Sequence, residues 1–247
     1  MAKLEWDVTG KRKLQAGVSK TVLYPMDGST YGDGVAWSGV TAINENPAGA
    51  DLTDLYADNI KYASMRAAET FGFGIEAYDY PDEWAECDGS VTPTTGVALG
   101  QQTRKAFGLC YRTEIGDDAH PGMDTGYQLH FVYNSTASPS GRGYATINNS
   151  PNAITMSWDA SSTPENVKGT NYKPVCTVVV DSTKVNADKL TAFEETIYGN
   201  ASTAAKMPLP HEIIAAFAST TGGETPPAGG NTETPAGGNT ETPAGGN

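Results

Sequence analysis

The feature that most constrains this chain is an alternation of apolar and polar side chains with a period of two, in short segments bounded by Gly, Pro, Asn and Asp. Residues 153–161, AITMSWDAS, show it most clearly, because Ile154, Met156 and Trp158 fall on one face and polar residues on the other. A half-buried β-strand requires this pattern. We therefore expect a chain built mainly from strands.

Other segments show the same signal between turn-forming residues. The further expected strands are 21–25, 34–43, 55–62, 71–80, 104–115, 127–134 and 175–182. An N-terminal arm of about residues 1–20 precedes them. Eight or nine short strands predict a β-sandwich or a barrel.

Helical periodicity is confined to the C-terminal part of the body. In residues 186–199, Asn186 is a helix-capping residue, Gly199 is suited to end the helix, and Leu190, Phe193 and Ile197 share one face. A shorter helix is expected over 210–218, opened by Pro210, and a weaker helical turn over 81–87. The strands are thus flanked by helix.

A sharp change in composition divides the chain near Ser219. Residues 219–247 contain Gly, Pro and Thr, repeat TETPAGGN, and lack large apolar side chains. Such a segment cannot bury enough apolar surface to offset the entropy lost on ordering. We expect a folded domain over 1–218 and a disordered C-terminal arm over 219–247.

The charge balance argues against nucleic acid and anionic membranes as binding partners. The chain has 16 basic and 29 acidic residues, a net charge of −13, which opposes binding to DNA or to an anionic membrane. Residues 1–20 contain no signal-peptide-like apolar run, so synthesis in a cytoplasm is expected, and no membrane span is predicted. The three distant cysteines do not indicate a disulfide framework.

Residues 76–88 place six carboxylates among Tyr78, Tyr80 and Trp84. Paired acids beside aromatic side chains are typical of a glycosidase cleft or a carbohydrate-binding module, and this is the alternative function. However, a strand followed by a helical turn scatters these acids in several directions. We favour a solvated acidic face, with Trp84 plugging the core. Trp158 and Phe193 are the other expected core anchors.

No catalytic or cofactor motif is evident. The three histidines are not in a metal-binding arrangement, and turn chemistry explains the Asp-rich loop around His120 better than a metal does. No phosphate-binding loop, dinucleotide fingerprint or nucleophile elbow is present. We expect no metal site, while a catalytic constellation whose residues meet only in the folded chain remains open at this point.

Several longer stretches, in their order and spacing, carry a resemblance to a known family. They are residues 31–62, IEAYDYPDEWAECDG at 75–89, GQQTRKAFGLCYRTEIG at 100–116, YQLHFVYN at 127–134 and ATINNSPNAITMSW at 145–158. Together they resemble the major tail protein, or tail tube protein, of long-tailed, siphovirus-like bacteriophages. The resemblance covers about residues 15–200.

This resemblance implies a structural virion protein with a tail-tube-type β-sandwich or barrel, with no enzymatic activity and no cofactor. Its copies would self-assemble into stacked six-membered rings that form an acidic conduit for the genome. The implied partners are the chain itself, tape measure, distal tail and terminator proteins, and passing double-stranded DNA that is not bound specifically. Assembly would occur in the bacterial host cytoplasm and the product would reside in the virion tail.

Residues 26–52 are rich in turn formers, which indicates a long loop that becomes ordered against a partner. The sequence therefore predicts a ring-stacking loop here. Its expected contact residues are Tyr31, Asp33, Trp37, Asn44, Glu45 and Asn46.

Overall fold

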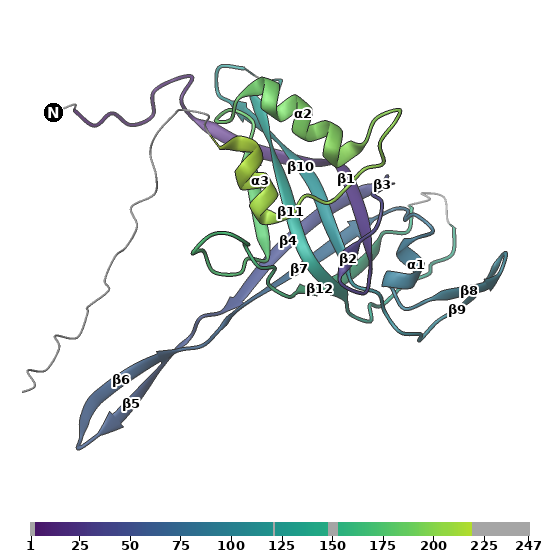
Figure 1. Ribbon diagram of the computed structural model, residues 1–247, viewed down its shortest axis with the longest axis horizontal. Helices are drawn as coiled ribbons and strands as arrows, with labels where there is room; N and C mark the ends of the chain where they lie inside the picture. The colour runs from purple at the N-terminus through teal and green to yellow at the C-terminus, as the bar shows by residue number, and fades with distance from the viewer. Residues whose placement is uncertain (1–2, 121, 148–152, 219–247) are drawn as a thin grey trace, which may run out of the picture. The chain divides into compact units, whose positions relative to one another are not determined.

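The computed structural model describes residues 3–120, 122–147 and 153–218, and its fold is mainly β (Figure 1). The predicted arm 219–247 lies outside the described residues. The strands are β1 (Lys13–Asp27), β2 (Thr30–Tyr31), β3 (Val35–Trp37), β4 (Val40–Gly49), β5 (Leu52–Ala57), β6 (Ile60–Arg66), β7 (Glu69–Ala77), β8 (Val91–Thr94), β9 (Val97–Leu99), β10 (Phe107–Asp117), β11 (Gly126–Ala137), β12 (Met156–Ser162) and β13 (Thr177–Asp181). The helices are α1 (Trp84–Cys87), α2 (Ala187–Tyr198) and α3 (Pro210–Phe217).

Within the described residues, nine strands form one antiparallel sheet. Its order is β2-β1-β10-β11-β12-β7-β4, while β3 also pairs with β1 and β13 also pairs with β11. Strand β11 changes partner along its length, because its first half pairs with β13 and its end pairs with β12. This change of partner allows the sheet to turn and fold over on itself.

The folded-over sheet encloses the first hydrophobic core. Trp37 from β3 lies 5.7 Å from Trp158 of β12 between ring centroids, although several strands separate β3 from β12 in the sheet order. Trp84 of α1 enters the same space and contacts both rings. Trp84 and Trp158, the expected core anchors, are 0% and 1% exposed. The expected mainly β fold is confirmed, as one large antiparallel sheet that folds around this core.

A second core lies on the opposite face of β1, β10 and β11. Alternate residues of these strands, such as Tyr24, Cys110 and Phe131, face α2 and α3 instead of the first core. Phe193 of α2 is 6% exposed and meets Phe131 at 5.9 Å between ring centroids. Both faces of these central strands are therefore covered.

The helices follow the sequence expectations. Asn186 caps α2, where its side chain accepts a hydrogen bond from the Lys189 backbone N–H at 3.1 Å. Gly199 ends this helix with a φ of 72°, in the left-handed region that glycine enters without strain. The expected helix over 210–218 is α3, and the weaker turn over 81–87 contains α1.

The strand expected over 55–62 is wrong. Asp58 and Asn59 have φ values of 51° and 63° and form a tight turn, so the segment is two strands, β5 and β6. Two successive residues with positive φ are typical of a two-residue hairpin turn, and Asp and Asn tolerate that conformation. The Asp-Asn pair is therefore the sequence signal that predicts this turn.

Two other expectations also need correction. The long loop over 26–52 is not present, because β2, β3 and β4 occupy most of it. The N-terminal arm of about 1–20 is shorter than expected, since β1 begins at Lys13 and pairs with β10 from that residue onward. The small strands β8 and β9 were missed, because their few exposed residues carry no alternation.

Candidate assembly surfaces

One face of the sheet is open to solvent, on the side of β4, β7 and β12 that points away from the core. Paired residues from the three strands lie across it in rows, such as Asn44, Gly74 and Asp159. The neighbouring residues of β7 and β12, including Ile75 and Trp158, point inward and are buried. The outward residues are small or polar: Ala42, Asn44, Asn46, Gly72, Gly74, Glu76, Ser157, Asp159 and Ser161.

This open sheet face is anionic. Strands β4, β7 and β12 place two carboxylates on this face, and none of the three strands contains Lys, Arg or His. Glu76 and Asp159 are on the open face, and neither makes an ion pair within the described residues. The Asn44 side-chain amide approaches Glu76 Oε1 at 3.5 Å. The surface therefore presents negative charge that no neighbouring cation neutralises.

The open face ends at a strand edge. Among the described strands, β4 pairs with β7 on one side and is the last strand of the sheet order on the other. An unpaired edge presents backbone N–H and C=O groups that can bind a strand of another chain. This edge can therefore continue the sheet into a second copy.

A second surface is the hairpin of β5 and β6, which continues from β4 and β7 beyond the sheet (Figure 1). Directly paired residues share a face of a hairpin, and successive residues alternate. One face carries Asp54, Lys61, Ser64 and Arg66 together with Leu52 and Tyr56. On it, Lys61 Nζ pairs with Asp54 Oδ1 at 2.8 Å and Ser64 donates a hydrogen bond to the same oxygen at 2.6 Å. The other face is formed by Thr53, Leu55, Ala57, Ile60, Ala63 and Met65.

The apolar face of this hairpin is uncovered. Leu55, Ile60 and Met65 are 42%, 65% and 60% exposed. A two-stranded hairpin is marginally stable in water unless a further surface covers it. Uncovered apolar side chains gathered on one face are typical of a protein–protein contact surface.

The first three residues expected in a ring-stacking loop lie apart from the hairpin. Trp37 is 3% exposed, and its indole N–H donates a hydrogen bond to the Asp79 carbonyl at 2.8 Å. It is a core residue, so its assignment to a stacking surface is wrong. Tyr31 accepts a hydrogen bond from the Asn134 N–H at 3.0 Å, and burial raises its pKa to about 12. Asp33 lines a groove beside α3.

The other three residues lie on β4 and not in a loop. Asn44 and Asn46 are on the open sheet face, whereas Glu45, between them, points to the inside of the folded sheet. These three residues therefore do not form one contact surface, because they lie on two opposite sides of β4. The side chains of Asn44 and Asn46 remain available to a partner.

Glu45 belongs to a cluster that sequence reasoning missed. Its carboxylate accepts a hydrogen bond from the Tyr111 hydroxyl, and the Tyr111 ring stacks on His130 with 4.7 Å between centroids. His130 Nε2 lies 3.0 Å from Thr113 Oγ1, and His130 Nδ1 lies 3.9 Å from Glu45 Oε1. Residues from β4, β10 and β11 meet here only because the sheet folds over, so no local sequence signal marks the site.

The cluster has the order hydroxyl, imidazole and carboxylate, as in a hydrolytic triad. Its geometry does not match one, because 3.9 Å from His130 Nδ1 to Glu45 exceeds hydrogen-bond distance and Tyr111 occupies that carboxylate. Burial lowers the pKa of His130 and raises that of Tyr111, so both rings are neutral near pH 7. The arrangement is that of a structural contact between β4 and β10.

The acidic stretch 76–88 is spread over several environments. Glu76 lies on the open face, Glu86 pairs with Lys105 at 2.5 Å, and Asp88 pairs with Arg142. Trp84 is fully buried, so it offers no platform on which a sugar ring can stack. The carbohydrate-binding and glycosidase interpretation therefore loses Trp84 as a stacking residue, whereas Tyr78 is 55% exposed.

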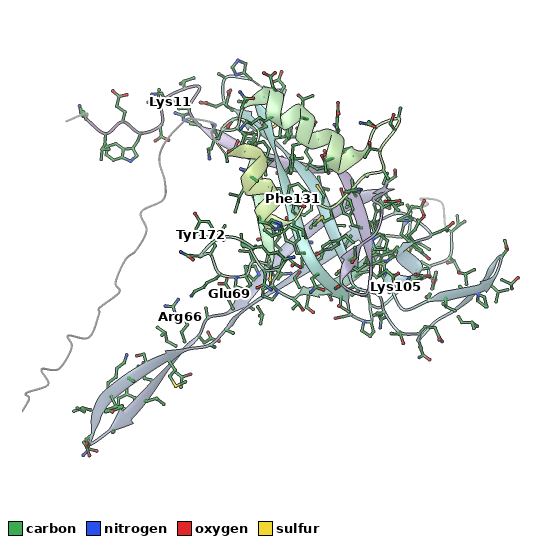
Figure 2. The ribbon with its side chains drawn as sticks, viewed as in Figure 1. Lys11, Arg66, Glu69, Lys105, Phe131 and Tyr172 are labelled. Atoms are coloured by element: carbon green, nitrogen blue, oxygen red, sulfur yellow. The ribbon has the colours of Figure 1, made fainter. Side chains whose placement is uncertain are left out.

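Figure 2 shows the side chains of the described residues. In this part of the chain, no three His, Cys, Asp or Glu side chains are arranged to hold a metal ion. None of the helices of residues 3–120, 122–147 and 153–218 has the length and apolar character of a membrane span. A scan against models of known protein families finds no match, and no curated protein sequence matches the chain.

Proposed function

We propose that copies of this chain assemble into rings that stack into a bacteriophage tail tube, through which double-stranded DNA passes. The observation that carries the proposal is the open sheet face, which has a free β4 edge and carries carboxylates but no cation. Joining such faces around a ring, edge to edge, produces a continuous β-surface with no exposed edges. The small side chains on this face would give the inner wall of the tube few protruding groups.

The charge of this wall suits a conduit. A cationic wall would bind DNA phosphates and release their counterions, which would hold the DNA in place. Glu76 and Asp159 instead repel phosphates that come within a Debye length of about 8 Å at physiological salt. The net charge of −13 per chain acts in the same direction. The DNA is thereby kept off the wall during passage.

Stacking of one ring on the next is assigned to the β5–β6 hairpin in place of the loop expected over 26–52. The hairpin combines exposed Leu55, Ile60 and Met65 with an opposite face that carries the charged residues Asp54, Lys61 and Arg66, so it can lie against another copy with its charged face in water. Six copies per ring, and contacts to tape measure, distal tail and terminator proteins, follow from the family resemblance. The proposed location is the virion tail.

Electron microscopy of the purified chain tests this proposal. Negative-stain images over a range of protein concentrations are compared with sedimentation velocity, and circular dichroism verifies the β fold. We expect rings or tubes with a central channel at high concentration. A folded chain that stays monomeric at every concentration and salt, including with purified tail-tip and terminator proteins added, would overturn the proposal.

A further inference from the structure

The N-terminal segment, residues 3–13, exposes large apolar side chains. Leu4 is 72% and Trp6 76% exposed, whereas the other three tryptophans of the chain are buried. Tryptophan is enriched among the residues that dominate protein–protein binding energy. This segment, which forms no helix or strand before Lys13 and exposes its tryptophan to water, is suited to bind a groove on a partner.

The segment is also basic in an acidic protein. It contains four basic and two acidic residues, while the whole chain has a net charge of −13. Arg12 pairs with Asp118 at 3.4 Å and approaches Asp7 at 3.8 Å. Lys3, Lys11 and Lys13 make no ion pair within the described residues. The segment therefore favours an apolar groove with an acidic rim.

The described residues contain a groove of this kind between α1 and the β8–β9 hairpin, which we call the α1–β8 groove. Pro25, Ala85, Val91 and Val97 contribute apolar lining, and Asp82, Glu83 and Glu86 contribute its charged residues. Glu86 pairs with Lys105, but Asp82 and Glu83 are exposed and make no ion pair within the described residues. A second groove, beside α3, is lined by Asp33, Lys168, Lys206 and Glu212, whose charges balance. Charge complementarity thus selects the α1–β8 groove.

The segment cannot reach this groove on its own chain. The Gly10 N–H donates a hydrogen bond to Asp118 Oδ1 at 2.8 Å, next to the end of β10 that pairs with Lys13. The groove includes Pro25, which pairs with Phe107 at the other end of β10. Ten residues of strand span about 34 Å, whereas the four residues from Gly10 back to Trp6 extend at most about 14 Å. Figure 2 shows Lys11 and Lys105, which mark the segment and the α1 region, well apart.

We propose that Leu4 and Trp6 of one copy bind in the α1–β8 groove of a second copy, with Lys3, Lys11 and Lys13 facing Asp82 and Glu83. The inference deepens the proposed function and rests on it, since it requires copies to associate. The donor segment and the acceptor groove are at opposite ends of β1, so the contact is head to tail. Head-to-tail contacts produce closed rings or open filaments, as a tube requires.

Tryptophan fluorescence tests the proposal directly. Because Trp37, Trp84 and Trp158 are at most 3% exposed, acrylamide quenches Trp6 selectively in the unassembled chain. We expect this quenchable component to disappear on assembly, and W6F to lack it already as a monomer. If wild-type tubes form but Trp6 stays as quenchable as in the monomer, this inference is overturned and the proposed function stands. If no assembly forms at all, the proposed function fails.

Charge reversal identifies the groove. D82K/E83K should raise the protein concentration needed for assembly about tenfold or more, and adding K3E/K11E/K13E in the same chain should restore much of the loss. D188K/E195K on α2, outside both surfaces, is the matched control and should assemble at the wild-type concentration. Wild-type assembly by D82K/E83K, or no recovery in the combined variant, would exclude this groove as the binding site of the segment.

Discussion

Glu45 on β4 accepts a hydrogen bond from the Tyr111 hydroxyl on β10, although β11, β12 and β7 separate these two strands in the sheet order. The contact exists because the sheet folds over, and it joins the two sides of the folded sheet. It thereby fixes β4, the strand that leads to the β5–β6 hairpin, to β10.

Removing this contact should destabilise the fold by a modest amount. Tyr111→Phe deletes the donor to Glu45, whose side chain is 39% exposed, so we expect a loss of about 1 kcal/mol in the free energy of unfolding. Tyr62→Phe, at a tyrosine that is 75% exposed, is the control and should change it by less than about 0.5 kcal/mol. Urea unfolding measures both. Equal stabilities for the two variants would show that the hydrogen bond contributes nothing.

His130 should make the fold less stable in mild acid. Burial lowers its pKa below the unfolded value of about 6.5, so the unfolded chain binds a proton that the folded chain excludes. The free energy of unfolding therefore falls as the pH drops from about 6.5 towards the lower folded pKa, and it levels off below that. His130→Gln should flatten this part of the pH profile in urea unfolding experiments between pH 7.5 and pH 5.

The comparison for this prediction is His120, which is affected in the opposite direction. Its hydrogen bond with Asp117 raises its pKa, so proton uptake by His120 favours the folded state as the pH falls. His120→Gln should therefore steepen the loss of stability in acid. Parallel profiles for wild type and His130→Gln would refute the assignment to His130.

The apolar face of the β5–β6 hairpin should be needed for assembly but not for folding. Leu55→Asp puts a charge on that face and should abolish tubes in electron micrographs, while the stability of the monomer changes by less than about 0.5 kcal/mol because Leu55 is 42% exposed. Leu52→Asp makes the same substitution on the opposite face, where the new carboxylate pairs with Arg66, and should still assemble. If both variants assemble equally, the hairpin does not mediate stacking.

Reversing the charge of the open sheet face should create DNA binding. Tubes of Glu76→Lys/Asp159→Lys should retain double-stranded DNA at low salt and release it as salt rises, because lysines that contact phosphates displace counterions. Wild-type tubes should retain none. Asp188→Lys/Glu195→Lys changes the net charge equally on α2 and should resemble wild type. Equal retention by both variants would mean that net charge, not this face, controls DNA contact.

Local sequence patterns determined the parts of this protein that depend on neighbouring residues. The cap at Asn186, the apolar face of α2 and the strand containing Trp158 follow from spacing along the chain, because helix and strand periodicities are properties of a single segment. The mainly β class and the flanking helices followed from these patterns. The turn at Asp58 and Asn59 could also have been predicted from these two residues, but the apolar residues around it indicated one continuous strand.

Tertiary structure decided which residues meet and which remain uncovered. Trp37 is in the core because the sheet folds over and brings Trp158 and Trp84 into contact with it. The sequence of a single segment does not predict such a long-range contact. The same fold turns Glu45 inward to Tyr111 while Asn44 faces water. Burial depends on how the whole chain packs. The sequence pattern therefore predicted most of the strands, whereas only the packing determined which residues are in the core and which are exposed to a partner.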